Sequence, residues 1–210
     1  MKMRSISLSL LTFCLLAAVP ALANTQLYTS GTTTGTANAY NIGSGHLTVS
    51  DPFTLLKHSD IETLTIVYWD SSNTDYLSTV QMEISSSALP VSGFETLTAD
   101  STSVLNSGNP NTHGVYEFQA NFTFNSINWL AGPGWITLEN ATCVTTGCTL
   151  SWDVNGTTTT AYDFNGTTTK SIDGETFTLD GDVVPEPSSL LLLGSGLLGL
   201  AGMLRRKLAR

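Results

Sequence analysis

The chain has 210 residues, a formal net charge of −9 and 12% charged residues. Six of its eight basic residues lie close to the two ends, which leaves Lys57 and Lys170 against sixteen acidic residues between positions 24 and 183, a formal charge of −14. Without a basic patch, this region is a poor partner for nucleic acid or anionic lipid. Its acidity can serve solubility or attract cations.

Residues 1–23 predict a helical secretory signal peptide, for which signal peptidase is the expected processing enzyme. A short positive region, an apolar run over positions 6–18 and an A-x-A site are its marks: Lys2, Arg4, Ala21 and Ala23. Cleavage after this site makes Asn24 the mature N-terminus. The alternative, a lipoprotein acylated at Cys14, is disfavoured because bulky Phe13 occupies a position that needs a small residue. The chain is therefore predicted to be exported.

Residues 24–183 predict one all-β domain, an antiparallel β-sandwich or jelly roll. Apolar and polar residues alternate in short runs, and no long segment shows the 3.6-residue period of a helix. The predicted strands are His46–Ser50, Ile61–Trp69, Leu77–Ile84, Val115–Phe124, Trp135–Thr142, Thr149–Val154, Thr159–Phe164 and Glu175–Asp180. Residues 24–45 have few large apolar side chains and are interpreted as a loose arm or an edge strand.

Turn signals separate these runs. They are Asp51-Pro52, Asn109-Pro110, Gly132-Pro133-Gly134, Asn155-Gly156 and Asn165-Gly166. Asn-Gly between alternating runs is the strongest of them, because both residues tolerate positive φ. Each is predicted to lie between two strands.

Two cysteines remain after signal cleavage, Cys143 and Cys148. In an exported protein they are predicted to form one disulfide, which closes a short loop at a hairpin tip. The C-x₄-C spacing gives no support to a redox-active pair, and no third or fourth soft ligand lies near in sequence to favour zinc.

No catalytic motif is present, and the domain is predicted not to be an enzyme. Its histidines, His46, His58 and His113, are far apart in sequence, and residues 24–183 contain no arginine. A Gly-x-Ser-x-Gly elbow, an H-E-x-x-H helix and a phosphate loop are all missing. Paired carboxylates of a glycoside hydrolase leave no sequence signature, so a secreted carbohydrate-active enzyme is the alternative.

No cofactor is predicted, although calcium remains an open alternative. Acidic and amide side chains cluster in Asp153-Val154-Asn155-Gly156, Asp173-Gly174-Glu175 and Asp180-Gly181-Asp182. Oxygen ligands on loops suit Ca²⁺. Asp-Gly pairs are explained equally well by turn chemistry, and the spaced EF-hand loop is absent.

A glycan-binding module is a further alternative. Trp129 and Trp135 flank the sequence Leu-Ala-Gly-Pro-Gly, which is interpreted as a loop that displays both rings. Exposed indole rings stack on sugar faces. Trp69 and Trp152 lie in predicted strands and are expected in the core.

The last 27 residues combine three features in order. Val184-Pro185-Glu186-Pro187 is followed by an uncharged apolar run over positions 188–204 and then by Arg205, Arg206, Lys207 and Arg210. Seventeen residues are the short limit for a helix that spans a bilayer, and the basic end is expected to stay in the cytoplasm. The physical prediction is a single C-terminal transmembrane helix that anchors an exported domain at the inner membrane.

This tripartite tail over residues 184–210 resembles the PEP-CTERM sorting signal of Gram-negative bacteria. The resemblance implies recognition by an integral-membrane exosortase and cleavage near Pro-Glu-Pro, so that the tail is a label more than an anchor. It also implies display at the cell surface or outside the cell, in association with exopolysaccharide and the biofilm matrix. A plain membrane anchor with two prolines in its linker is the alternative.

Overall fold

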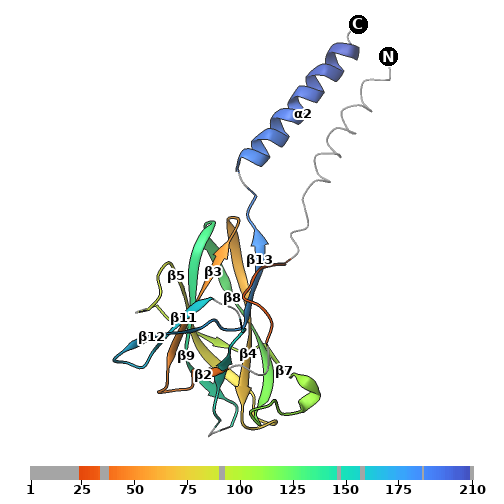
Figure 1. The fold of residues 1–210 in the computed structure, drawn as a ribbon. Coiled ribbons are helices and arrows are strands. Elements are labelled where there is room, and N and C mark those ends of the chain that lie inside the picture. The colour runs from red at the N-terminus through yellow and green to blue at the C-terminus, as the bar shows by residue number, and fades with distance from the viewer. Residues whose placement is uncertain are drawn as a thin grey trace.

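The computed structural model describes residues 24–33, 38–89, 93–145, 148–156, 159–185 and 187–208. The described residues form two antiparallel sheets, and one long helix, α2 (Pro187–Leu208), extends away from them (Figure 1). The all-β prediction for the domain is confirmed. The predicted signal peptide, including Ala21 and Ala23, lies outside the described residues, whereas Asn24 is described and exposed.

The seven-stranded sheet is built around one central strand, β4. On one edge β4 pairs with β8, which pairs with β7; on the other edge β4 pairs first with β13 and then with β10. β1 and β2 complete the two branches, next to β13 and β10 respectively. The strands of this sheet are β1 (Thr25–Thr29), β2 (Ala39–Asn41), β4 (Ser59–Asp70), β7 (Ser101–Val104), β8 (Tyr116–Trp129), β10 (Ser151–Asp153) and β13 (Phe177–Val183).

The six-stranded sheet has the order β12-β11-β3-β9-β5-β6. Its strands are β3 (Thr48–Leu55), β5 (Leu77–Ser85), β6 (Glu95–Thr98), β9 (Gly132–Cys143), β11 (Thr160–Phe164) and β12 (Thr169–Asp173). A short 3₁₀ turn, Asn106–Gly108, links β7 to the loop before β8.

Apolar side chains from both sheets form a single core. Its largest fully buried members are Trp152, Tyr68, Phe53, Phe118, Phe122 and Phe177. Tyr68 stacks on Phe118 at 5.3 Å, and its hydroxyl accepts the Leu77 N–H at 3.0 Å. This bond fixes the start of β5 in one sheet to a β4 side chain of the other. As expected, Trp69 and Trp152 are both buried.

Each of the eight predicted strands overlaps a strand of the structure. Three further strands were not predicted: β6, β7 and β12. Residues 24–45 were interpreted as an arm or an edge strand, and β1 and β2 do lie at the edges of their sheet.

The prediction of a turn at Asp51-Pro52 is wrong, because both residues lie inside β3. Asp51 is opposite Ile136 and Pro52 is opposite Trp135 of β9. On its other side β3 pairs with β11 only over Thr48–Ser50. Pro52 therefore occupies a stretch with one neighbouring strand, where a proline is tolerated.

The prediction of a turn at Gly132-Pro133-Gly134 is also wrong, because the three residues open β9 and pair with β3. A Cβ on Gly134 would lie 2.4 Å from Phe53 and 2.6 Å from Trp129. Glycine is needed here so that two aromatic rings can pack against the strand, and not for chain reversal.

Of the two Asn-Gly pairs, one forms a turn between paired strands and the other does not. Asn165-Gly166 connects the paired strands β11 and β12, as a hairpin turn should. Asn155-Gly156 instead connects β10 in one sheet to β11 in the other, so it is a crossing between sheets.

Gly181 marks a close approach between β13 and β4. The pairing of these strands shifts register between Asp180 and Gly181, and an added Cβ would lie 2.0 Å from the Asp60 carbonyl oxygen. The obstacle is backbone, which a rotamer change cannot relieve.

We therefore expect Gly181→Ala to lower the free energy of unfolding by about 1–3 kcal/mol, the usual cost of overpacking. Urea denaturation would measure the change. Gly93→Ala is the matched control, because its Cβ would make only ordinary contacts of 3.6 Å or more with Glu83. Equal stability of the two variants would contradict this account of the strand junction.

Candidate functional site

The chain leaves the sandwich within the predicted processing motif. The Val184 N–H still donates to the His58 carbonyl at 2.9 Å, and Pro185 is exposed. Glu186 lies outside the described residues, and α2 begins at Pro187. Proline suits the first helical position because its φ is already helical and its missing N–H would have no partner there. The motif is therefore the junction between the last strand and the helix.

Helix α2 is not covered by the described part of the sandwich (Figure 1). A Cβ at any of its four glycines would meet nothing within 4 Å. From residue 193 onward, where its side chains are described, the exposed large apolar ones are 46% to 83% exposed: Leu193, Leu197, Leu198, Leu200, Met203, Leu204 and Leu208. In the part of the chain that the structure describes, no helix has the length and apolar character needed to cross a membrane. The predicted helix is present, and its prediction as a membrane span is not confirmed.

Three of the four predicted basic residues, Arg205, Arg206 and Lys207, lie in the last turn of α2 and are exposed. Cations at this end of a helix interact favourably with its dipole. Arg210 lies outside the described residues.

Cys143 and Cys148 form the predicted disulfide, with Cα atoms 6.3 Å apart. The hairpin-tip prediction is wrong. Cys143 ends β9 of the six-stranded sheet, and the next strand, β10, belongs to the seven-stranded sheet. The disulfide loop therefore lies at a crossing between sheets.

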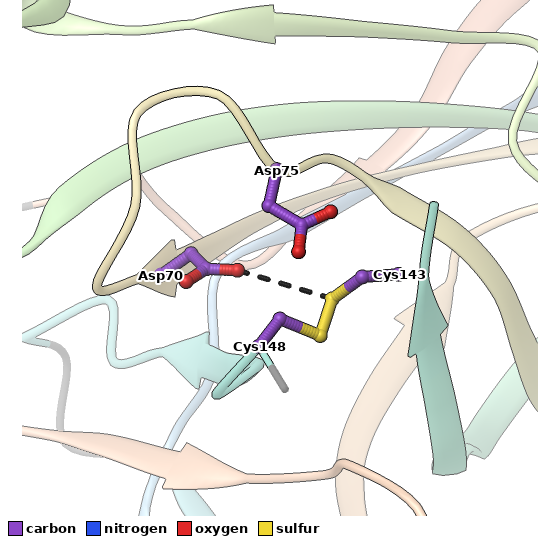
Figure 2. A group of neighbouring side chains, drawn as sticks. All are labelled: Asp70, Asp75, Cys143 and Cys148. Atoms are coloured by element: carbon purple, nitrogen blue, oxygen red, sulfur yellow. Dashed lines mark hydrogen bonds between the residues drawn. A yellow bond between two sulfur atoms is a disulfide. The ribbon is translucent and has the colours of Figure 1, made fainter. Parts of the chain in front are cut away.

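Two carboxylates face this disulfide (Figure 2). Asp70 ends β4 and is 1% exposed, and Asp75 precedes β5 and is 6% exposed. Asp70 Oδ2 lies 3.9 Å from Cys143 Sγ, and one ligand atom from each of the four side chains falls within 4.8 Å of the others. Within the described residues, this is the one group of three or more Asp, Glu, His or Cys side chains that converges in this way.

Hydrogen bonds hold both carboxylates in place. Asp70 accepts from the Ser72 N–H at 3.0 Å, and Asp75 accepts from the Thr145 N–H at 3.1 Å and from the Thr145 hydroxyl. Burial raises the pKa of Asp70, the Ser72 and Ser71 hydrogen bonds oppose the rise, and the Asp75 charge adds to it. The sequence analysis did not identify these aspartates, although Asp-x₄-Asp repeats the spacing of Cys-x₄-Cys.

A second acidic group, Asp51 and Glu175, is fully buried. Asp51 Oδ2 accepts the Glu175 N–H at 2.5 Å, whereas Asp51 Oδ1 and both Glu175 carboxyl oxygens have no hydrogen-bond partner. Burial raises the pKa of Asp51 to about 7. Burial, followed by the charges of Asp51, Asp153 and Asp173, raises the pKa of Glu175 well above its usual value.

Asp153 and Asn155, from the segments on which the calcium alternative rested, lie beside this group. Asn155 Nδ2 donates to the Glu175 carbonyl at 2.8 Å, and burial raises the pKa of Asp153 to about 6 against a lowering hydrogen bond from Thr33. The third predicted loop, Asp180-Gly181-Asp182, is part of β13 and not a loop. The structure thus gathers two of the three predicted segments.

The two predicted glycan-contact residues are not displayed on a shared loop. Trp129 ends β8 in the seven-stranded sheet and packs on Phe53 at 5.5 Å, against the core. Trp135 lies in β9 of the six-stranded sheet, and its ring is 5.6 Å from Tyr162. Both rings are partly buried.

Comparison with known proteins identifies the tail. The model of the PEP-CTERM protein-sorting motif matches residues 183–207. No curated protein and no solved structure matches the chain. The chain therefore carries a PEP-CTERM sorting motif, which indicates an exported protein targeted to an exosortase and a precursor attached to the membrane through its C-terminal tail.

The buried acids predict that stability falls as the pH rises. The ordinary pKa of Asp51 and Asp153 is 3.8, and their folded values are about 7 and about 6. The folded state therefore binds more protons between pH 4 and 7. Its extra stability is complete below the ordinary pKa and is lost as the pH rises through the folded values, by about 1.4 kcal/mol per pKa unit. Urea denaturation at pH 5 and pH 8 should show the difference.

Glu175→Gln tests the origin of this dependence. An amide cannot ionise, so the variant should be more stable than wild type at pH 8 and should depend less on pH. Glu95→Gln, at an exposed position in β6, is the matched control and should follow wild type. The account fails if both variants keep the wild-type pH profile.

Proposed function

We propose that this protein is an exported, non-catalytic component of the cell surface or extracellular matrix, delivered by its C-terminal tail and then separated from it. In the precursor, the apolar run of the tail would lie in the inner membrane with its basic end in the cytoplasm. The exosortase would cut close to Pro185 and Pro187. The β-sandwich, residues 24–183, is the part that reaches its destination.

The observation that carries this proposal is the strand-to-helix junction. Among the residues that the structure describes, Val184 makes the last backbone hydrogen bond to the sandwich, and the next residue, Pro185, is exposed. Proline also biases the preceding residue toward extended backbone, the form in which a processing enzyme takes a chain. Because no described residue of α2 belongs to the hydrophobic core or packs against it, cleavage here would release the helix without exposing core residues.

The placement of the titratable groups supports a non-catalytic role. Asp51, Asp153 and Glu175 are 0% exposed, so they are out of reach of a substrate. Of the histidines, His58 bonds Asn128 at 2.9 Å and His113 packs on Trp69 at 5.2 Å. A secreted carbohydrate-active enzyme remains the alternative, and product release from a polysaccharide would favour it.

One observation favours exopolysaccharide as a ligand. The rings of Trp135 in β9 and Tyr162 in β11 lie 5.6 Å apart across the intervening strand β3. Beside them, the buried Thr137 hydroxyl donates a 2.9 Å hydrogen bond to Ser50 of β3. The two rings are partly exposed, and exposed aromatic faces suit stacking on sugar faces.

The junction predicts how the tail is processed. In the native host, mass spectrometry of surface and culture fractions should find a mature C-terminus near residues 185–188. A double variant, Pro185→Ala with Pro187→Ala, should accumulate in the inner membrane with an intact end at Arg210. Pro110→Ala, in an exposed loop, is the control and should be processed normally. Normal processing of the double variant would contradict the proposed role of the motif.

The aromatic pair predicts a weak glycan contact. Trp135→Ala should reduce retardation of the protein in native gels that contain the host's exopolysaccharide, by roughly two- to tenfold in affinity if one stacking contact is lost. Trp135→Phe keeps an aromatic face and should restore most of the retardation. No retardation of the wild-type protein would exclude this ligand.

A further inference from the structure

The disulfide and the two carboxylates beside it come from distant parts of the chain. Asp70 and Asp75 flank the β4–β5 connection, and Cys143 and Cys148 flank the β9–β10 connection. Figure 2 shows both carboxylates turned toward the sulfur atoms. The pairing of β5 with β9, which places Leu77 opposite Cys143, brings the two connections together.

This arrangement is electrostatically costly with a disulfide at its centre. A disulfide carries no charge and no proton, so Cys143 Sγ offers nothing to Asp70 Oδ2 across their 3.9 Å contact. Asp70 and Asp75 are 1% and 6% exposed, and one oxygen of each carboxylate lies within 4.8 Å of the other, so their negative charges repel each other. The two lysines of the domain lie elsewhere, Lys57 between β3 and β4 and Lys170 in β12. A cation placed between these groups would relieve the repulsion.

We propose that reduction of this disulfide creates a four-ligand site for a thiophilic divalent cation, with Zn²⁺ as the best match. Cys143 and Cys148 supply two thiolates, and Asp70 and Asp75 supply one carboxylate oxygen each. Two sulfur and two oxygen ligands suit tetrahedral zinc, and their total charge equals that of a four-cysteine zinc site.

The chemistry balances with a thiol reductant. A dithiol gives two electrons and two protons to the S–S bond, which becomes two thiols, while the dithiol is oxidised to its own disulfide. The metal ion then displaces the two thiol protons, which leave to solvent as two metal–sulfur bonds form. The reverse exchange, in which the oxidised dithiol takes back two electrons, re-forms the Cys143–Cys148 disulfide and releases the metal ion, so the metal and the disulfide exclude each other.

The distances require only a small rearrangement. In a tetrahedral zinc site, bonds of about 2.3 Å to sulfur place the two sulfurs about 3.8 Å apart. Cα atoms 6.3 Å apart allow this separation by side-chain rotation. The two sulfurs must therefore move apart by about 1.7 Å once their bond is broken. The wider separations among the four ligand atoms, up to 4.8 Å, must shorten by about 1.3 Å.

The test uses the full chain, purified in detergent and reduced with a phosphine that does not bind metals. Titration with Co²⁺ alone should produce one equivalent of a complex with thiolate-to-cobalt charge-transfer bands and the visible bands of tetrahedral cobalt, and Zn²⁺ should bleach both. Unreduced protein should show neither. Absence of charge-transfer bands in the reduced protein would overturn the proposal.

Variants identify the ligands. Asp70→Asn and Asp75→Asn should each weaken Co²⁺ binding at least tenfold, whereas Asp100→Asn, at an exposed position, should leave it unchanged. Unchanged binding in both Asn variants would show a bare dithiol and overturn the four-ligand site.

A measurement on the wild-type chain covers the case in which the variants do not fold. Zn²⁺ added to the reduced protein should protect Cys143 and Cys148 from alkylation by iodoacetamide, as read by mass spectrometry. Equal alkylation with and without Zn²⁺ would count against the site.

Discussion

The seven-stranded sheet depends on the pairing of β4 along both of its edges. β8 covers one edge from Ser59 to Asp70, and β13 and β10 divide the other. Each of these partners carries a further edge strand, so the complete sheet cannot form before residues from positions 25 to 183 have met. Because backbone groups buried without partners are costly, this double pairing also fixes where the chain can leave the sandwich. The exit follows β13, which is where the sorting motif begins.

Strand β4 also connects the core to the two aspartates, Asp70 and Asp75, that face the disulfide. Tyr68 of β4 stacks on Phe118 and holds the start of β5 through its hydroxyl. Two residues later β4 ends at Asp70. The turn that follows passes through Asp75 and leads into β5 at Leu77. The packing of Tyr68 in the core therefore positions both carboxylates, although the carboxylates themselves lie outside the core. Their short hydrogen-bonded turns then determine how they face the sulfur atoms.

Alternation of apolar and polar residues predicted the strands that bury one face, such as β4, β5 and β8. It failed for β6, β7 and β12, whose sequences ETLT, STSV and TKSID are mostly exposed and carry too few apolar residues to show a period. Turn chemistry failed where tertiary contacts govern: Pro52 occupies a strand with one neighbour, and Gly134 gives room to two rings. Local residue preferences predict a turn only where no tertiary contact requires the same glycine or proline for another reason.

The functional features divide in the same way, into those with a local sequence signal and those that depend on contacts between distant parts of the chain. The sorting tail could be predicted because its three parts are contiguous in sequence. The disulfide followed from a count of cysteines in an exported chain. Neither the approach of Asp70 and Asp75 to the disulfide nor the enclosure of Asp51 with Glu175 could be predicted, because each depends on the register between strands far apart in sequence.

The exposure of α2 outside the sandwich has a consequence for how proteins with this sorting motif diversify. Among the described residues, none from α2 belongs to the hydrophobic core, so we expect removal of the helix to leave the folding equilibrium of the sandwich unchanged. We therefore expect mutations in the β-domain to leave recognition of the sorting motif unchanged, and mutations in the motif to leave the β-domain folded. The junction at Val184 is thus a boundary between two independent targets of selection, at which one β-domain can be exchanged for another.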